Sequence, residues 1–337
     1  MRRMRTRRVL THGLIAAGAA LALTLTGCSS SGSGSSAGSG GSAATGKKLT
    51  IGYVSYSLAT APQQGLVTGQ TEEAKKYGYS IKTADSQASS ASANSLMQTF
   101  VTQKVDAIHV DSYSPDVLQA GIQAAKSARI PVYLSMSDGT PTDVASIVRA
   151  NAGTAESEQL VQDLGTTGDV LAFTLPSGSN CVSSENQFDT VMAKTPGIKI
   201  TKHPVAVPGF ESDAASVTKA WLRNHPAGTP LAVWSCWDGP ALGAASALIE
   251  SNRLDVKDYG QNTEAKTVDL LEKKQFTASW YIDAVALGRE IVDQVHGNAD
   301  KNYSDIKGVF SSFAVIPVNQ ANVTEFAAKY PQVLKGS

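Results

Sequence analysis

A strand–helix–strand unit at residues 49–85 constrains the fold more than any other feature of this chain. Residues 49–55 are short, apolar and rich in β-branched and aromatic side chains, which predicts a buried strand. Pro62 suits the first turn of a helix, Gly78 ends that helix, and residues 79–85 form the next strand. A helical crossover between two strands makes them parallel, so the segment predicts a parallel α/β sheet.

The same alternation continues to the end of the chain and predicts two successive α/β series. Further strands are expected at residues 107–110, 130–134, 145–148, 169–175, 198–203, 231–234, 256–259, 277–281 and 314–318. Helices are expected at residues 93–101, 115–127, 154–164, 185–193, 214–224, 240–251, 264–273, 283–296 and 323–330. Val117 is expected to face inward in its helix, and residues 176–184 to form a long polar loop. The 291 residues from Lys47 onward exceed one ordinary core and therefore predict two lobes.

The first 27 residues read as an export signal rather than as part of the fold. Five arginines precede an apolar run at residues 13–25, which is too short for a comfortable membrane span. Residues 25–28, Leu-Thr-Gly-Cys, resemble the bacterial lipobox, which implies cleavage before Cys28 and a lipid on its sulfur. A plain secretory signal is the alternative, and Arg7-Arg8 leaves a twin-arginine route open.

A tether comes directly after the signal, and the chain without its leader carries a mild negative charge. Residues 29–46 contain only Ser, Gly, Ala and one Thr, so they predict a flexible leash. Removal of the leader leaves 24 basic against 29 acidic side chains, a net charge of −5. Such a chain is a poor binder of nucleic acid or of an anionic membrane, so contact with the membrane is expected through the lipid alone.

No enzyme, metal or cofactor is predicted. The histidines are scattered without metal-ligand spacing, and neither a nucleophile elbow nor a phosphate loop is present in the sequence. His109 is expected to be a core residue of its strand. Asp238 and Asn262 could imitate catalytic groups, but the position of Asp238 at the start of a helix favours a capping role.

An ordered set of segments carries a family resemblance. These segments are residues 52–55, 73–79, 85–87, 105–111, 128–132, 238–244 and 317–323. In this order the chain resembles the type I periplasmic binding proteins of the ribose- and galactose-binding group, the solute receptors of ABC importers. The resemblance implies two Rossmann-like lobes with parallel sheets, joined by a three-crossover hinge. It places residues 47–150 and 283–311 in the N-terminal lobe, and residues 151–282 and 312–337 in the C-terminal lobe.

The resemblance also implies a ligand site at the strand ends between the lobes. Gln63 and Gln64 stand where sugar-binding relatives have an aromatic pair, Ser135-Met136 replaces an Asp-Arg pair, and the arginine expected within residues 181–188 is missing. Asp111 matches a polar position of the family, Phe210 an aromatic one, and Asn262 a later Asp, while Trp237 replaces an Asn. The full set of expected ligand contacts is Tyr56, Gln63, Gln64, Asp111, Ser135, Met136, Phe210, Trp237, Asp238, Asn262 and Tyr281.

The loss of Asp and Arg and the gain of aromatic side chains predict a small, uncharged polar ligand with a flat face. A sugar or polyol derivative is favoured over a nucleoside or an aromatic solute. Trp234 and Trp280 either join Trp237 in the cleft or pack in the lobe core, and the sequence leaves this choice open. Import through an ABC permease by a monomeric receptor is the favoured function, and ligand sensing by an anchored ectodomain is the alternative.

A disulfide between Cys181 and Cys236 is expected on the same basis. They are the cysteines that remain once Cys28 is lipidated, in a compartment where paired thiols persist. In the family's sheet order the strands that precede them are neighbours, with their carboxyl ends at the cleft. Two unrelated buried thiols are the alternative.

Overall fold

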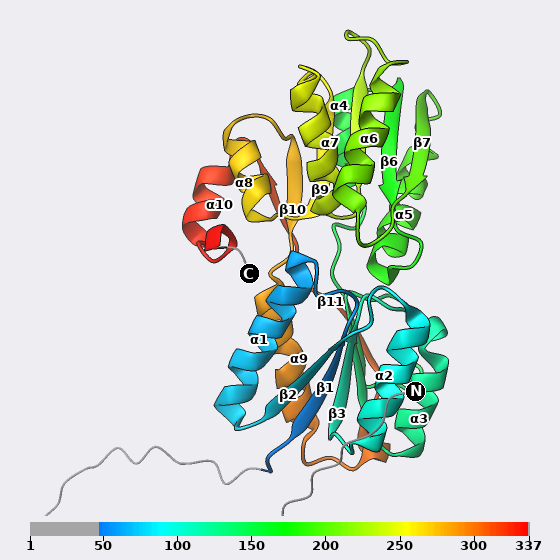
Figure 1. Cartoon of the computed structure of the whole chain (residues 1–337), viewed down its shortest axis with the longest axis vertical. Coiled ribbons are helices and arrows are strands. Elements are labelled where there is room, and N and C mark those ends of the chain that lie inside the picture. Colours follow the sequence, from blue (N-terminus) through cyan, green and yellow to red (C-terminus); the bar gives the residue numbers. More distant parts are fainter. Residues whose placement is uncertain (1–46, 336–337) are drawn as a thin grey trace, which may run out of the picture. The chain divides into compact units, whose positions relative to one another are not determined.

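The computed structural model describes residues 47–335 as two α/β lobes (Figure 1). The predicted signal, the predicted lipidation site Cys28 and the predicted tether lie outside the described residues. Within residues 47–335, none of the helices is both long enough and apolar enough to cross a membrane.

The first lobe contains a six-stranded parallel sheet in the order β11-β5-β4-β3-β1-β2. Its strands are β1 (Thr50–Ser55), β2 (Ser80–Asp85), β3 (Ala107–Asp111), β4 (Val132–Ser135), β5 (Ser146–Arg149) and β11 (Val309–Ser312). One face is covered by α1 (Ala61–Tyr77) and α9 (Ala284–Asn298), and the other by α2 (Ser90–Thr102), η1 (Pro115–Leu118) and α3 (Gln119–Ser127). The short turn η2 (Tyr303–Asp305) precedes β11.

The second lobe contains a six-stranded sheet in the order β12-β10-β9-β8-β6-β7. Its strands are β6 (Gly168–Thr174), β7 (Ile198–Pro204), β8 (Leu231–Ser235), β9 (Lys257–Asn262), β10 (Ala278–Tyr281) and β12 (Ile316–Asn319). Its helices are α4 (Ala155–Leu164), α5 (Ser179–Met192), α6 (Phe210–Leu222), α7 (Asp238–Glu250), α8 (Ala265–Glu272) and α10 (Val323–Lys329), with η3 (Val333–Lys335) after them. The edge strand β12 runs antiparallel to β10, so this sheet is not entirely parallel.

Three passages of the chain join the lobes: after β5, between β10 and α9, and between β11 and β12. The helix α9 comes after the second passage and packs on α1 of the first lobe. A Cβ on Gly69 of α1 would stand 1.9 Å from the carbonyl oxygen of Val285, so the two helices approach too closely for a larger side chain. The predicted lobe boundary after residue 311 falls inside β11, because that strand continues through Ser312.

Two local predictions were wrong, and one strand was missed. Val117 is 46% exposed instead of buried, because its segment is a 3-10 turn that turns Leu118 rather than Val117 inward. The expected loop at residues 176–184 is short, since α5 already begins at Ser179. The strand β11 was not predicted, because this edge strand of four residues is mostly exposed and lacks an apolar pattern.

Candidate functional site

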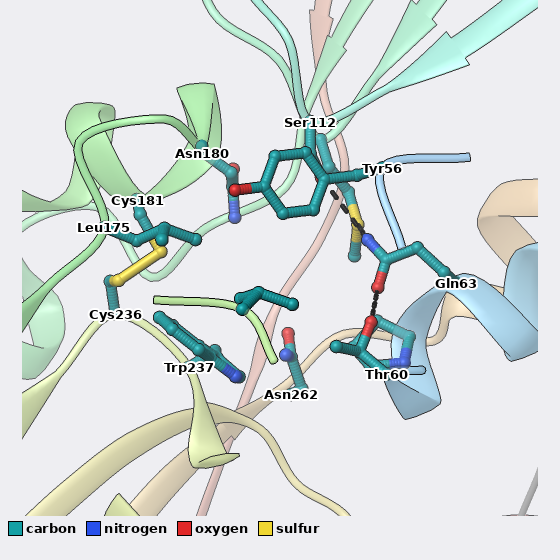
Figure 2. A pocket seen from close by; sticks show the side chains of 14 residues that line it. Tyr56, Thr60, Gln63, Ser112, Leu175, Asn180, Cys181, Cys236, Trp237 and Asn262 are labelled. Carbon is teal, nitrogen blue, oxygen red and sulfur yellow. Dashed lines mark hydrogen bonds between the residues drawn. A yellow bond between two sulfur atoms is a disulfide. The ribbon is translucent and has the colours of Figure 1, made fainter. Parts of the chain in front are cut away.

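A pocket lies where strands and helix N-termini of both lobes meet (Figure 2). It leaves about 60 Å³ to the centres of water-sized molecules. Its first-lobe wall consists of Tyr56, Thr60, Pro62, Gln63, Ser112 and Met136. Its second-lobe wall consists of Leu175, Gly178, Asn180, Cys181, Val207, Cys236, Trp237 and Asn262.

The first-lobe wall is organised by a carboxylate that lies beneath it. Asp111, at the end of β3, has no exposed surface. One of its oxygens accepts hydrogen bonds from the Tyr53 hydroxyl at 2.9 Å and the Tyr56 amide at 2.8 Å. The other accepts from Gln63 Nε2 at 2.7 Å and the Ser112 hydroxyl at 2.9 Å. Burial raises the pKa of Asp111, while these donors act in the opposite direction.

Gln63 is fixed at both ends of its amide. Its nitrogen donates to Asp111, which is not drawn in Figure 2. Its oxygen accepts a hydrogen bond from the Thr60 hydroxyl, which a dashed line in Figure 2 marks. The helix α1 supplies Gln63 in its first turn, so the amide is held by a rigid element. A polar group with a fixed orientation loses little entropy when it binds a hydroxyl.

The second-lobe wall is mostly apolar and is joined by the Cys181–Cys236 disulfide. The bridge was predicted, and it connects the first turn of α5 to the residue after β8. Trp237 is the next residue, and its indole packs edge-on against Phe210 with ring centroids 5.5 Å apart. Among the described residues, the buried Asn180 Oδ1 has no hydrogen-bond donor.

None of the described side chains that line this pocket is charged. In addition, no group of three or more His, Cys, Asp or Glu within residues 47–335 is placed to hold a metal ion. The pocket therefore offers hydroxyls, amides and apolar surface. These groups suit a neutral solute and would leave an ionic ligand without a charged partner.

Three strand ends adopt a left-handed backbone at the pocket. Ser112, Met136 and Asn262 have φ values of 62°, 47° and 96° and follow or end β3, β4 and β9. Non-glycine residues rarely adopt this conformation, and such residues cluster at binding sites. The backbone therefore departs from regular geometry where the pocket is lined.

Five residues expected from the sequence line the pocket, namely Tyr56, Gln63, Met136, Trp237 and Asn262. Other expected residues support it from behind: Asp111 holds Gln63, and Phe210 packs on Trp237.

Gln64, Ser135 and Tyr281 are not part of this lining. Gln64 donates to the Leu58 carbonyl, 3.0 Å away. The buried Ser135 bonds to Nε2 of His109, and Tyr281 packs against Phe326 next to a different hollow.

Asp238 forms hydrogen bonds between elements of the second lobe. It is fully buried, and it accepts hydrogen bonds from Ser279 Oγ at 2.8 Å, Glu264 N at 3.1 Å and the Thr267 hydroxyl. Burial raises its pKa to about 6. The cap of α7 is Trp237, so Asp238 joins the start of α8 to α7 instead of capping its own helix.

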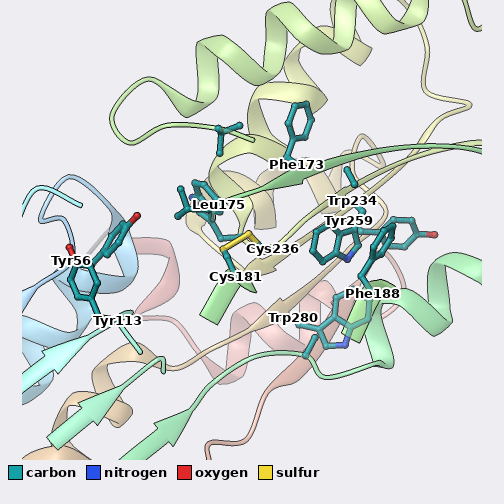
Figure 3. Packing of buried hydrophobic residues seen from close by; sticks show 14 of the residues in the cluster. Tyr56, Tyr113, Phe173, Leu175, Cys181, Phe188, Trp234, Cys236, Tyr259 and Trp280 are labelled. Atoms are coloured by element: carbon teal, nitrogen blue, oxygen red, sulfur yellow. A yellow bond between two sulfur atoms is a disulfide. The ribbon is translucent and has the colours of Figure 1, made fainter. Parts of the chain in front are cut away.

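Trp234 and Trp280 belong to the lobe core, which settles the choice that the sequence left open. Trp234 is 1% exposed and stacks on Phe188 with centroids 4.6 Å apart (Figure 3). Trp280 is buried in the same apolar cluster. Of these three tryptophans, only Trp237 lines the pocket.

Several lining residues were missed by the sequence analysis: Thr60, Pro62, Ser112, Leu175, Gly178, Asn180 and Val207. Ser112 and Leu175 directly follow strands, so strand-end position alone could have found them. Asn180 was hidden by the wrong assignment of its helix to a loop. Val207 lies in the irregular segment between β7 and α6, where the sequence gives no signal.

Comparisons with known proteins agree on one protein family. The family described as "Periplasmic binding protein domain" matches residues 51–302. The "Xylitol-binding protein" of Mycolicibacterium smegmatis is 28% identical over 254 residues, which cover 74% of this chain and 69% of the relative.

Two solved structures share the fold at low sequence identity. An ABC transporter solute-binding protein from Agrobacterium vitis with bound allitol has a TM-score of 0.75 and 23% identity, with 84% of this chain and 99% of that chain covered. A second, from Bacillus halodurans with bound myo-inositol, has a TM-score of 0.72 and 19% identity, with 84% and 98% covered.

Proposed function

This chain belongs to the periplasmic binding protein domain family, and on that premise we propose that it captures a small neutral polyol or sugar derivative for an ABC importer. The observation that carries the proposal is a pocket of about 60 Å³ without a charged side chain in its lining. Neutral hydroxyls can exchange hydrogen bonds with Gln63, Asn180 and Asn262, whereas a carboxylate or an ammonium would be buried without a partner.

The relatives support this ligand class. One relative is named for xylitol, and two structural neighbours hold allitol and myo-inositol. All three compounds are uncharged polyols. Trp237 adds a flat apolar face, which suits the carbon-bound hydrogens of a polyol or of a sugar ring.

We propose that the protein binds its solute and does not catalyse a reaction on it. His109, which could otherwise act as a base, is fully buried and bonds to Gln70 and Ser135. Burial lowers its pKa to about 3, so it is neutral and forms part of the core. The receptor would act as a monomer that passes its solute to a permease.

The test is thermal unfolding of the full chain carrying Cys28→Ala, with and without xylitol, allitol or myo-inositol. A ligand at 100 times its Kd should raise the unfolding free energy by about 2.7 kcal/mol. Gluconate and glucosamine, which carry a charge, serve as matched controls and should have no effect. Stabilisation by amino acids or by the charged compounds alone would contradict the proposal.

Anchoring outside the cell through a lipid on Cys28 is part of the same proposal. It rests on the lipobox-like residues 25–28 and on the Ser/Gly tether next to them. Replacing Cys28 with Ala should move the protein from the membrane fraction to the medium, or leave it unprocessed. A variant that stays in the membrane at the wild-type mass would refute lipid anchoring.

A further inference from the structure

We propose that the Cys181–Cys236 disulfide is a positioning element of the binding site, so that its oxidation state and ligand affinity are linked. The inference rests on the proposed function, because it concerns the same pocket. Both cysteines line the pocket, and both are almost completely buried there.

Each cysteine is the chain neighbour of a residue that faces the pocket. Asn180 precedes Cys181 in the first turn of α5, and Trp237 comes after Cys236 at the start of α7. The bridge therefore connects the segment that carries the Asn180 amide to the segment that carries the Trp237 ring through one covalent link (Figure 2).

The start of α5 has hydrogen bonds to both lobes. Within its own lobe the Gly178 amide donates to the Leu175 carbonyl at 3.1 Å, and the Ser184 hydroxyl accepts from Gln261 at 3.4 Å. The N-cap of α5 is Gly178, which provides no side-chain cap. Ser179 instead bonds to the first lobe: its amide donates to the Ser112 carbonyl at 2.7 Å, and its hydroxyl accepts from the Asp138 amide at 3.0 Å. These hydrogen bonds exist only while the lobes are in contact.

Lobes of this kind part about a hinge to admit a solute. When they part, Ser179 loses its first-lobe partners, and the disulfide remains as the covalent tie that holds Asn180 beside Trp237. A wall that keeps its bound geometry in the open state lowers the ordering cost of binding. The bridge thus preorganises the second-lobe wall.

Thermodynamic linkage requires that the bridge and the ligand affect each other equally. If the bridge favours ligand binding, bound ligand must protect the bridge against reduction by the same factor. In that reduction a dithiol such as dithiothreitol supplies two electrons and two protons. The S–S bond breaks to give two thiols, and the dithiol closes to its cyclic disulfide.

The experiment measures the Kd for xylitol, allitol and myo-inositol by calorimetry, in the full chain carrying Cys28→Ala. Three states are compared: oxidised, reduced with dithiothreitol, and Cys181→Ala with Cys236→Ala. Loss of the bridge should raise Kd about tenfold in both bridge-free states, since about one ligand hydrogen bond is misplaced. The reduced protein keeps all side-chain heavy atoms and lacks only the S–S bond. It therefore still tests the proposal if the double variant fails to fold.

A double-mutant cycle separates positioning from stability. In an Asn180→Ala background, loss of the bridge should raise Kd less than about threefold, because the group that it positions is already absent. Equal losses in both backgrounds would overturn the proposal. An unchanged Kd together with a lower melting temperature would also overturn it, since the bridge would then serve stability alone.

If no polyol binds the oxidised protein, the polyol proposal fails and hydrogen exchange decides the role of the bridge. Faster exchange at the amides of residues 179–182 and 237–239 after reduction supports positioning. Unchanged exchange in both segments overturns it.

Discussion

The two walls of the pocket differ in polarity and in the interactions that hold them in place. The first-lobe wall presents hydroxyl and amide groups that a buried carboxylate, Asp111, holds through a hydrogen-bond network. The second-lobe wall presents mainly apolar surface, held by the disulfide and by the packing of Trp237 on Phe210. One wall is therefore suited to hydroxyls and the other to the carbon skeleton of the same ligand.

Two buried aspartates sharpen the contrast. Asp111 and Asp238 are both fully buried and both accept several hydrogen bonds. Asp111 directs Gln63 to the pocket, whereas the partners of Asp238 are Thr267, Ser279 and the Glu264 amide. The same residue type thus supports recognition in one lobe and internal cohesion in the other.

The largest expected effect is that of Asp111→Ala. It leaves the Tyr53 hydroxyl, the Tyr56 amide and the Gln63 amide without their acceptor, so the free energy of unfolding should fall by about 3 kcal/mol. The melting temperature should fall by roughly 6–12 °C. The matched control, Asp116→Ala, removes an exposed carboxylate from the next turn and should change stability by less than about 0.5 kcal/mol. Equal melting temperatures for both variants would show that the network does not support the first-lobe wall.

A smaller effect is expected on ligand affinity, and it should differ between variants of the two walls. Gln63→Ala removes one oriented amide and should raise the Kd for xylitol about tenfold. Trp237→Phe keeps an aromatic face and should raise it less than about threefold. Gln64→Ala, which changes a neighbour outside the pocket lining, should leave Kd unaltered. If Gln64→Ala weakens binding as much as Gln63→Ala, the assignment of the first-lobe wall is wrong. Calorimetric titration measures all three variants.

The smallest effect concerns pH, and it has opposite signs for Glu264 and Asp238 of the second lobe and for His109 of the first lobe. Burial raises the pKa of Glu264 from 4.5 to about 7 and that of Asp238 from 3.8 to about 6. Protonation of these groups stabilises the second lobe below about pH 4, and this contribution is lost as pH rises through 6 to 7. Burial lowers the pKa of His109 in the first lobe from 6.5 to about 3. The stability contributed by neutral His109 is present above pH 6.5 and is lost as pH falls toward 3.

The melting temperature of the second lobe should rise when the pH is lowered from 7.5 to 5, and this rise should be smaller in Glu264→Gln. The difference should be roughly 2–4 °C for each kcal/mol of unfolding free energy that the variant no longer gains. Tryptophan emission reports this lobe, because all four tryptophans lie between residues 221 and 280. Glu272→Gln, which changes an exposed glutamate at the end of α8, the helix that begins after Glu264, is the matched control. An unchanged pH dependence in Glu264→Gln would exclude this carboxyl as its source.

The sequence by itself determined the alternation of strands and helices, because apolar periodicity and the Pro and Gly boundaries are local. The family resemblance then supplied the pairing of Cys181 with Cys236, since it placed β6 beside β8. The absence of the Asp-Arg pair and of the second-lobe arginine led to the prediction of an uncharged ligand, and the side chains that line the pocket are uncharged. These features depend on residue identity at strand ends, which can be read along the chain.

Only the tertiary structure decided which strand-end side chains reach the pocket. Asp111 was expected among the ligand contacts; in the structure it lies behind the pocket lining and accepts a hydrogen bond from Gln63 of α1, which lines the pocket. Phe210 lies behind Trp237, and Asn180 enters the pocket because α5 begins earlier than its polar sequence indicated. The physical reason is that the direction of a side chain at a strand end depends on local backbone angles and on packing partners that are distant in sequence. Those partners are fixed only when the complete lobes have folded.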